Sequence, residues 1–234
     1  MNKDLYSRHR FPPEIISHAV WLYFRFCLSF RDIEELLASR GVIVSNETIR
    51  QWCLKFGQQF ANLLHHSRPK RGDKWHLDEV YLAINGKLHY LWRAVDQYGH
   101  VLDILVQTRR NAHAAKRFFR KILKGMCYTP RVIITDKLKS YAAAKAAIMP
   151  GVEHRQHKGL NNRAEVSHQP TRLREKQMRR FKSAGHAQRF LSAHAPINNL
   201  FRCRRHRLGR VEYRELREKA FLTWQIVTQA QVAA

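Results

Sequence analysis

The period of the hydrophobic pattern changes near Trp75, and this change separates two differently folded parts of the chain. Between Pro13 and about Phe60, apolar residues recur at three- and four-residue spacing, which predicts three helices. From Lys74 to Ile84 the chain is almost continuously apolar, as expected for a strand buried on both faces. The sequence therefore predicts a helical module followed by an α/β domain.

The part that begins at Trp75 has the pattern of three strands, a helix, a strand, a helix, a strand and a further helix. Asn85-Gly86 marks a tight hairpin between the first two strands. Asn111 suits the N-cap of the first helix, and Pro150-Gly151 ends the second. This order predicts a mixed sheet flanked by helices and is similar to the order of the ribonuclease H-like fold.

The chain is strongly basic, with 43 Lys and Arg against 18 Asp and Glu and a formal net charge of +25. A field of this sign attracts phosphate backbones, so nucleic acid is the natural partner. Ribosomal and DNA-coating proteins share such a charge, which therefore indicates a partner but not an activity.

Other classes of protein find little support. The four cysteines lie far apart and form no Cys-x-x-Cys pair, so no structural zinc site is expected. The N-terminus lacks the apolar region of a secretory signal, and the longest apolar run is too short to span a bilayer. We expect a cytoplasmic, nucleoid-associated protein that does not contact membranes.

The second and third expected helices are separated by a short turn that contains Gly41, a layout typical of a helix-turn-helix. In a neutral protein an ordinary three-helix bundle would be the better interpretation, but the net charge favours DNA binding. If the third helix enters a major groove, residues near its start meet base edges and a later residue lies near phosphate. The candidates are Asn46, Glu47, Arg50 and Gln51 for bases, and Lys55 for phosphate.

Asp78 is an acid inside an apolar strand, and burial of an unpaired carboxylate is costly unless a cation or hydrogen bonds compensate. Asp136 follows a short apolar strand, at the position where open α/β sheets place functional groups. Glu165 opens a helix, with His168 and Arg172 expected on its face. Elements in this order bring the three acids to one edge of the sheet.

Three carboxylates at one edge repel one another, and hard divalent cations relieve that repulsion. We therefore predict that Asp78, Asp136 and Glu165 hold two Mg²⁺ ions, with Mn²⁺ as a possible substitute, for phosphoryl transfer. Each acid has an ordinary alternative, namely a buried ion pair, a helix N-cap and a helix-dipole contact respectively. Glu79 should point to the opposite face of the strand and is not a candidate.

Between Arg155 and Lys182 the Lys and Arg residues greatly outnumber the two acids, Glu165 and Glu175. A solvated face usually mixes both signs, so this segment is predicted to face DNA phosphates. The alternative is a charged face with no ligand. The candidate contacts include Arg155, Lys158, Arg179 and Arg180.

Four segments carry a resemblance that covers the chain from about Leu5 to Arg210. They are W-H-L-D-E-V-Y at 75–81, Y-L-W-R-A-V-D at 90–96, I-T-D-K at 134–137 and V-E-H-R-Q-H-K-G-L-N-N-R-A-E at 152–165. Together they resemble the DDE transposases of bacterial insertion sequences, above all the small, cointegrate-forming family called insertion sequence six.

The resemblance implies that the acids at positions 78, 136 and 165 bind the metals and that Arg172 contacts terminal DNA. It also implies replicative transposition, in which a homodimer or higher oligomer binds the terminal inverted repeats, nicks the element ends and joins the freed 3′-hydroxyl to target DNA. The chain departs from the family pattern twice. The connection from Asp136 to Glu165 is shorter than usual, and Pro170 falls in the expected glutamate helix, where it should kink the axis.

These arguments predict four segments. Residues 1–65 form a helix-turn-helix DNA-binding domain and 66–74 a linker. Residues 75–182 form a ribonuclease H-like (retroviral integrase-type) DDE catalytic core, and 183–234 form a helical C-terminal extension.

Two other functions would use some of the same features. A ribonuclease H-like nuclease would need the same acids, but it has less use for a helix-turn-helix that recognises element ends. A non-enzymatic regulator would need only the helix-turn-helix and would leave the three acids unexplained. Short inverted repeats on both sides of the gene would favour the transposase over both.

Overall fold

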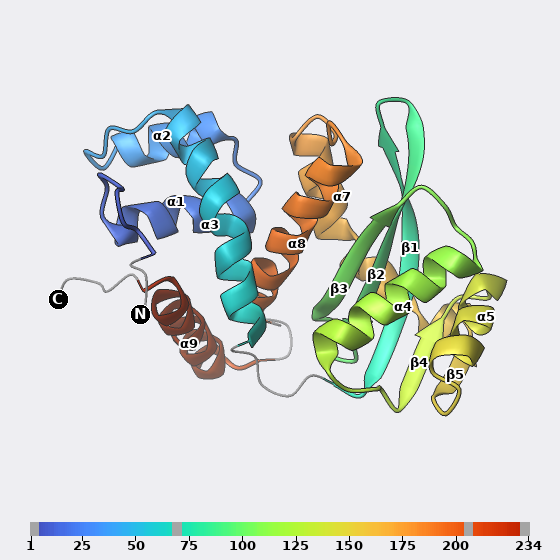
Figure 1. Cartoon of the computed structure of the whole chain (residues 1–234). Helices are drawn as coiled ribbons and strands as arrows, with labels where there is room; N and C mark the ends of the chain where they lie inside the picture. Colours follow the sequence, from blue (N-terminus) through green and yellow to red (C-terminus); the bar gives the residue numbers. More distant parts are fainter. Residues whose placement is uncertain (1–4, 67–71, 204–207, 230–234) are drawn as a thin grey trace. The chain divides into compact units, whose positions relative to one another are not determined.

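The computed structural model describes residues 5–66, 72–203 and 208–229, without the side chains of His66 and Lys158. The residues group into two compact units, Met1–Ser67 with Pro196–Ala234 and Arg68–Ala195 (Figure 1). The division falls at Pro196, inside helix α8 (Ala184–Leu200). Within the described ranges, no helix is long and apolar enough to cross a membrane.

The first unit begins with the three helices that the sequence predicts, α1 (Pro13–Arg25), α2 (Phe30–Ala38) and α3 (Asn46–His66). Ser29 and Asp32 form a reciprocal capping box at the start of α2, which satisfies two backbone donors of its first turn. Gly41 adopts φ +77° after α2, a left-handed conformation that glycine reaches without strain. Ser45 Oγ then accepts from the Thr48 amide at the start of α3.

Helix α9 (Arg210–Thr228) completes the apolar core of the first unit. The Trp224 ring meets Phe60 edge-on at 5.4 Å between centroids, and it also contacts Phe201. One turn further along α9, the Thr228 carbonyl accepts from the Tyr6 hydroxyl at 2.6 Å. The boundaries predicted from sequence stay predictions, but these contacts group the C-terminal residues with the N-terminal helices.

The second unit is built on a five-stranded sheet in the order β3-β2-β1-β4-β5. Strands β1 (Lys74–Ile84), β2 (Lys87–Asp96) and β3 (Val101–Gln107) form an antiparallel meander, and β4 (Val132–Thr135) and β5 (Glu153–Gln156) run parallel to β1. Asn85 and Gly86 both have positive φ, as the predicted hairpin requires. The mixed α/β fold with a ribonuclease H-like order is confirmed.

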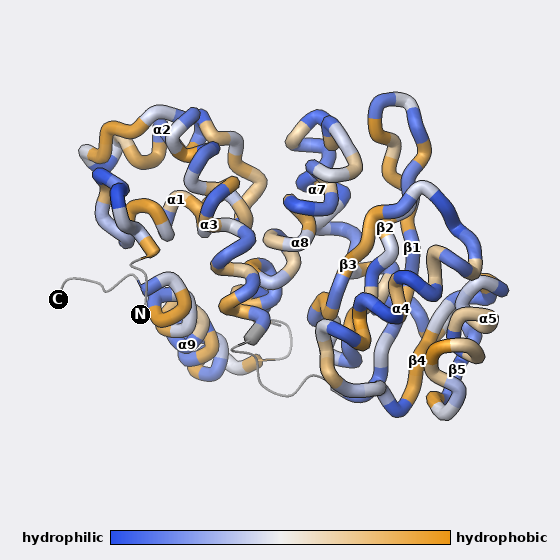
Figure 2. Tube along the Cα trace, in the orientation of Figure 1, coloured by the Kyte–Doolittle hydropathy of each residue, from blue (hydrophilic) through white to orange (hydrophobic). Residues whose placement is uncertain are grey.

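Helices α4 (Ala112–Met126) and α5 (Lys139–Ile148) cover one face of this sheet (Figure 1). Phe118 and Tyr141 pack there on Trp75, Leu77 and Trp92 in one buried cluster. Figure 2 shows β4, the strand between β1 and β5, as a continuous hydrophobic segment. Because side chains alternate along a strand, the residues next to this cluster, Asp78 among them, face the opposite side.

The glutamate helix differs from the expectation of one helix kinked by Pro170. The chain forms α6 (Asn162–Ser167), and a second helix, α7 (Gln169–Gln177), begins immediately after it with Pro170 in its first turn. Proline is tolerated in a first turn, where no earlier carbonyl needs its missing amide hydrogen. Glu165 and Arg172 therefore lie on different helices, and the prediction that they share one helix face is wrong.

We expect the contacts of α9 to determine the stability of the first unit. Trp224 is 5% exposed, and Trp224→Ala leaves a cavity beside Phe60. The substitution should therefore lower the unfolding free energy of the protein by about 3–5 kcal/mol. Leu222→Ala on the same helix is the control, since Leu222 is 57% exposed and should change stability by less than about 0.5 kcal/mol. Urea unfolding measures both, and equal losses would contradict the assignment of α9 to this core.

Candidate active site

Asp78 and Asp136 lie on neighbouring parallel strands. His76 on β1 pairs with Ile134 on β4, and each aspartate lies two residues beyond that pair. Asp78 is thus in the middle of β1 beside the point where β4 ends and Asp136 follows. The strand pairing therefore places the two aspartates on adjacent strands, and their union in one site stays a prediction.

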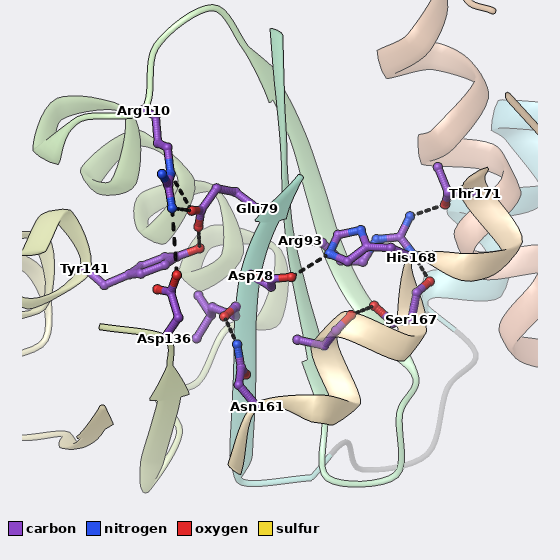
Figure 3. A network of polar contacts seen from close by, with 12 residues as sticks. Asp78, Glu79, Arg93, Arg110, Asp136, Tyr141, Asn161, Ser167, His168 and Thr171 are labelled. Atoms are coloured by element: carbon purple, nitrogen blue, oxygen red, sulfur yellow. Dashed lines mark hydrogen bonds and ion pairs between the residues drawn. The ribbon is translucent and has the colours of Figure 1, made fainter. Parts of the chain in front are cut away.

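The Asp78 side chain faces α6 and is 14% exposed (Figure 3). Its Oδ2 lies 3.2 Å from Nε2 of His168, the residue between α6 and α7. Burial raises the pKa of Asp78 to about 6, and the charge of Asp136 acts in the same direction. Burial, with Arg93 and Arg172 nearby, lowers the pKa of His168 to about 2, so its imidazole is neutral and does not compensate the carboxylate as a cation would.

Asp136 is more accessible, with 32% of its side chain exposed. Its Oδ1 accepts from the Leu138 amide at 3.0 Å, which is a local turn and not a helix cap, because the N-cap of α5 is Leu138 and receives no side-chain cap bond. Its Oδ2 lies 3.8 Å from a guanidinium nitrogen of Arg110. The two aspartates therefore interact electrostatically while their carboxylates are engaged in different directions (Figure 3).

Glu79 points to the face of β1 opposite Asp78, as predicted (Figure 3). Arg110 contacts its Oε1 at 2.6 Å, and the Tyr141 hydroxyl donates to Oε2 at 2.7 Å. Burial raises the pKa of Glu79, and the hydrogen bonds from Tyr141 and Arg110 oppose that shift. Arg110 thus bridges Glu79 and Asp136. Sequence reasoning missed Arg110 and Tyr141, because no local spacing connects residues so far apart in the chain.

Glu165 lies on α6 with an exposed side chain. Helix α6 contacts β1 and β2, which places Glu165 on an element that packs on the Asp78 strand. Among the residues that the structure describes, no three Asp, Glu, His or Cys side chains are gathered as a metal-binding cluster. The two aspartates nevertheless supply the hard oxygen donors that suit a divalent cation, and their mutual repulsion favours one.

The five base- and phosphate-contact candidates on α3 all have partners within the protein. The Glu47 carboxylate accepts from Arg50 at 2.7 and 2.8 Å and from Gln51 at 2.8 Å. Asn46 donates to Glu34 at 2.8 Å, and the Lys55 ammonium lies 2.7 Å from a ring nitrogen of His9. These bonds orient side chains of α3 that are exposed or half-buried.

The basic segment 155–182 is not uniformly exposed. Arg174 is buried, with its guanidinium 5.6 Å from the centre of the Phe190 ring, so the prediction that the whole segment faces phosphate is wrong at this residue. Arg155 pairs with Glu153 at 2.6 Å, and Arg172 pairs with Glu175 at 2.9 Å. Arg179 and Arg180 are exposed at the end of α7, both with positive φ. The Lys158 side chain lies outside the described part of the chain.

Comparison with known proteins identifies the family. A family model described as a DDE domain matches residues 72–204, more than half of the chain. The transposase for insertion sequence element IS257 in transposon Tn4003 of Staphylococcus aureus is 34% identical over 176 residues, which cover 73% of this chain and 78% of the relative. The transposase for insertion sequence-like element IS431mec of Staphylococcus aureus strain Mu50 shows the same identity and coverage.

A chain in the cryo-EM structure of the simian T-cell lymphotropic virus intasome with a PP2A regulatory subunit aligns with 68% of this chain and 63% of its own length. The identity is 12% and the TM-score is 0.39, too low to bear on function. The DDE domain match and the two staphylococcal relatives carry the assignment. The chain belongs to the DDE transposases of the insertion sequence six family, which cut and join DNA strands with the help of divalent metal ions.

Proposed function

We propose that Asp78, Asp136 and Glu165 form the catalytic centre of this insertion-sequence transposase and hold two Mg²⁺ ions, which Mn²⁺ can replace. The observation that carries the proposal is the position of Asp78 and Asp136 beyond the same paired residues of β1 and β4. The raised pKa of Asp78 supports it, because a carboxylate that is buried beside a second acid gains most from a bound cation.

The bound ions would supply charge neutralisation at the phosphate and activation of the attacking oxygen. The chain's own residues prepare that arrangement. Arg110 offsets part of the negative charge of Glu79 and Asp136. His168 remains uncharged at neutral pH, so it carries no imidazolium proton to donate and no charge that repels a cation. Glu165, exposed on α6, would complete the set of carboxylates from the helix that packs on β1 and β2.

The proposed DNA substrate has two parts, the terminal inverted repeats of the element and the target duplex. Helix α3 would read the repeats through Asn46, Arg50 and Gln51, with Lys55 on phosphate. Arg155, Lys158, Arg172, Arg179 and Arg180 would hold the DNA that is cut. We propose that a homodimer or higher oligomer acts on DNA in the bacterial nucleoid, nicking the ends and joining the 3′-hydroxyl to target DNA.

Loss of any one of the three acids should separate chemistry from binding. Asp78→Asn, Asp136→Asn and Glu165→Gln each keep the shape of the side chain but remove a ligand charge, so nicking and strand joining should both be lost. DNA binding should persist, because each change removes a negative charge near phosphate. His168→Ala should be milder than any of them. End cleavage in Mg²⁺ or Mn²⁺, beside a gel shift on the same DNA, measures both properties. Cleavage by Asp78→Asn, or by the wild type in excess chelator, would exclude the proposed centre.

The pH dependence of stability tests the state of Asp78. A carboxyl whose pKa rises on folding destabilises the native state when it ionises, so the penalty is absent below about pH 4 and complete above about pH 6. Asp78→Asn should therefore stabilise the metal-free protein by about 1–3 kcal/mol at pH 7.5, and the gain should vanish near pH 4. Added Mg²⁺ should stabilise the wild type more than the variant.

Asp73→Asn is the control for that measurement. Asp73 pairs with Arg131 on the surface, and this hydrogen bond lowers its pKa, so the variant should show no gain at neutral pH. Thermal unfolding across the pH range gives both curves. If Asp78→Asn increases stability by the same amount at every pH, the increase does not come from removal of an ionised carboxylate, and the proposed state of Asp78 is wrong.

Sequence recognition by α3 depends most on Arg50 in this proposal. Arg50→Ala should weaken binding to the terminal repeat by about 1–3 kcal/mol and binding to random DNA much less, as expected for a base contact. Arg31→Ala, an exposed cation on α2, should weaken both equally. Fluorescence anisotropy with the two DNAs at one salt concentration makes the comparison. Equal loss on both DNAs for Arg50→Ala would place Arg50 on phosphate.

A further inference from the structure

The helix that carries Glu165 is too short to fix its own orientation. Helix α6 has six residues, fewer than two turns, and helices of this length depend on tertiary contacts. It is followed at once by the break at His168 and the start of α7. The position of Glu165 relative to the aspartates must therefore be set by contacts at the two ends of α6.

Asn161 attaches the N-terminal end of α6 to the Asp78 strand. Asparagine at an N-cap normally accepts from a backbone amide of the first turn, but Asn161 makes no side-chain bond to its own helix. Its buried Nδ2 instead donates to the carbonyl of Leu77 at 2.9 Å, next to Asp78 (Figure 3). The capping group of α6 is thus used to hold β1.

Arg93 attaches the C-terminal end of α6 to the neighbouring strand. It lies directly opposite Asp78 in the β1–β2 register and is buried. One of its terminal nitrogens donates to the carbonyl of Ser167, the last residue of α6, at 2.5 Å. The other donates to the Thr171 hydroxyl in α7 (Figure 3). A cation at a helix C-terminus is electrostatically favourable, and here it also spans the break between the two helices.

We infer that Asn161 and Arg93 are positioning residues that clamp both ends of the Glu165 helix to the strand pair at Asp78. The inference rests on the proposed catalytic role of the three acids. Asn161 binds the carbonyl of Leu77, one residue before Asp78, and Arg93 lies directly across from Asp78. Together they set where α6 lies along β1. The three acceptors are two backbone carbonyls and a hydroxyl. Because none of them is a carboxylate, the clamp leaves the acids available to bind ligands.

The test measures metal binding and strand cleavage separately on the full-length protein. Asn161→Leu removes the donor to Leu77 with little change in volume. Arg93→Lys keeps the charge but cannot bond both acceptors, because an ammonium lacks the fork of a guanidinium. Gln107→Leu is the matched control, since Gln107 is also a buried amide that donates to a backbone carbonyl, that of Ala114 at 2.9 Å, away from α6.

For Asn161→Leu, Mn²⁺ affinity of the DNA-free protein, followed by electron paramagnetic resonance, should fall roughly 10- to 100-fold, as when groups that orient metal ligands are lost. The Mg²⁺ concentration for half-maximal cleavage should rise by a similar factor. Arg93→Lys should shift both in the same direction by less. DNA affinity and the unfolding temperature should change no more than in Gln107→Leu.

Mn²⁺ affinity equal to that of the wild type in both Asn161→Leu and Arg93→Lys would overturn the clamp, and so would an equal loss of affinity in Gln107→Leu. If Asn161→Leu does not fold, Arg93→Lys decides the question. Asp78→Asn distinguishes this failure from a failure of the proposed function. If Asp78→Asn itself binds Mn²⁺ and cleaves DNA like the wild type, the acid centre is wrong, whatever the clamp variants do.

Discussion

The second unit depends on keeping an ionisable carboxylate, that of Asp78, inside a sheet. Burial alone raises its pKa, and the neighbouring Asp136 makes ionisation harder still. Arg110 and Arg93 oppose this effect from a distance, while neutral His168 does not. The balance leaves a carboxyl whose pKa is about 6, so it is mostly ionised at neutral pH yet poorly compensated within the protein. Such a group favours any divalent cation that reaches it.

Strand β1 separates two polar networks that an apolar sheet would not otherwise contain. On one side Glu79 binds Arg110 and Tyr141, and on the other Asp78 meets His168. Consecutive residues of a strand point to opposite faces, so Asp78 and Glu79 place one carboxylate on each face of the sheet. Arg110 connects the first network to Asp136. The charge of Asp136 raises the pKa of both Asp78 and Glu79, so it acts on the acids of both faces.

The local hydrophobic pattern predicted the helices and strands well. The expected pairing of buried strands predicted part of the candidate site. Alternation and turn residues identify β1 to β3, and a buried strand followed by Asp136 implies proximity to Asp78. The contacts of Arg93 and Asn161 could not be predicted, because they join positions more than seventy residues apart through a hydrogen-bond geometry that no spacing encodes. The helix break at His168 was expected only as a kink, since proline suits both a kink and a new first turn. An amphipathic helix such as α9 shows an apolar face but does not identify the core that buries it.

The few acids of this basic chain are often placed against the cations proposed to meet DNA. Glu47 holds Arg50 and Gln51, and pairs of the same kind hold Arg155 and Arg172. The exposed pairs made by Glu47 and Glu153 contribute only about 0–1 kcal/mol, so a phosphate or base edge can displace these carboxylates at low cost. Until then, the pair restricts the rotamers of a long side chain and reduces the entropy lost on binding. DNA that fails to offer a well-placed acceptor would leave each cation with the carboxylate it already has. With the DNA contacts proposed above, the intramolecular pairs would favour a correctly placed duplex over one that only supplies negative charge.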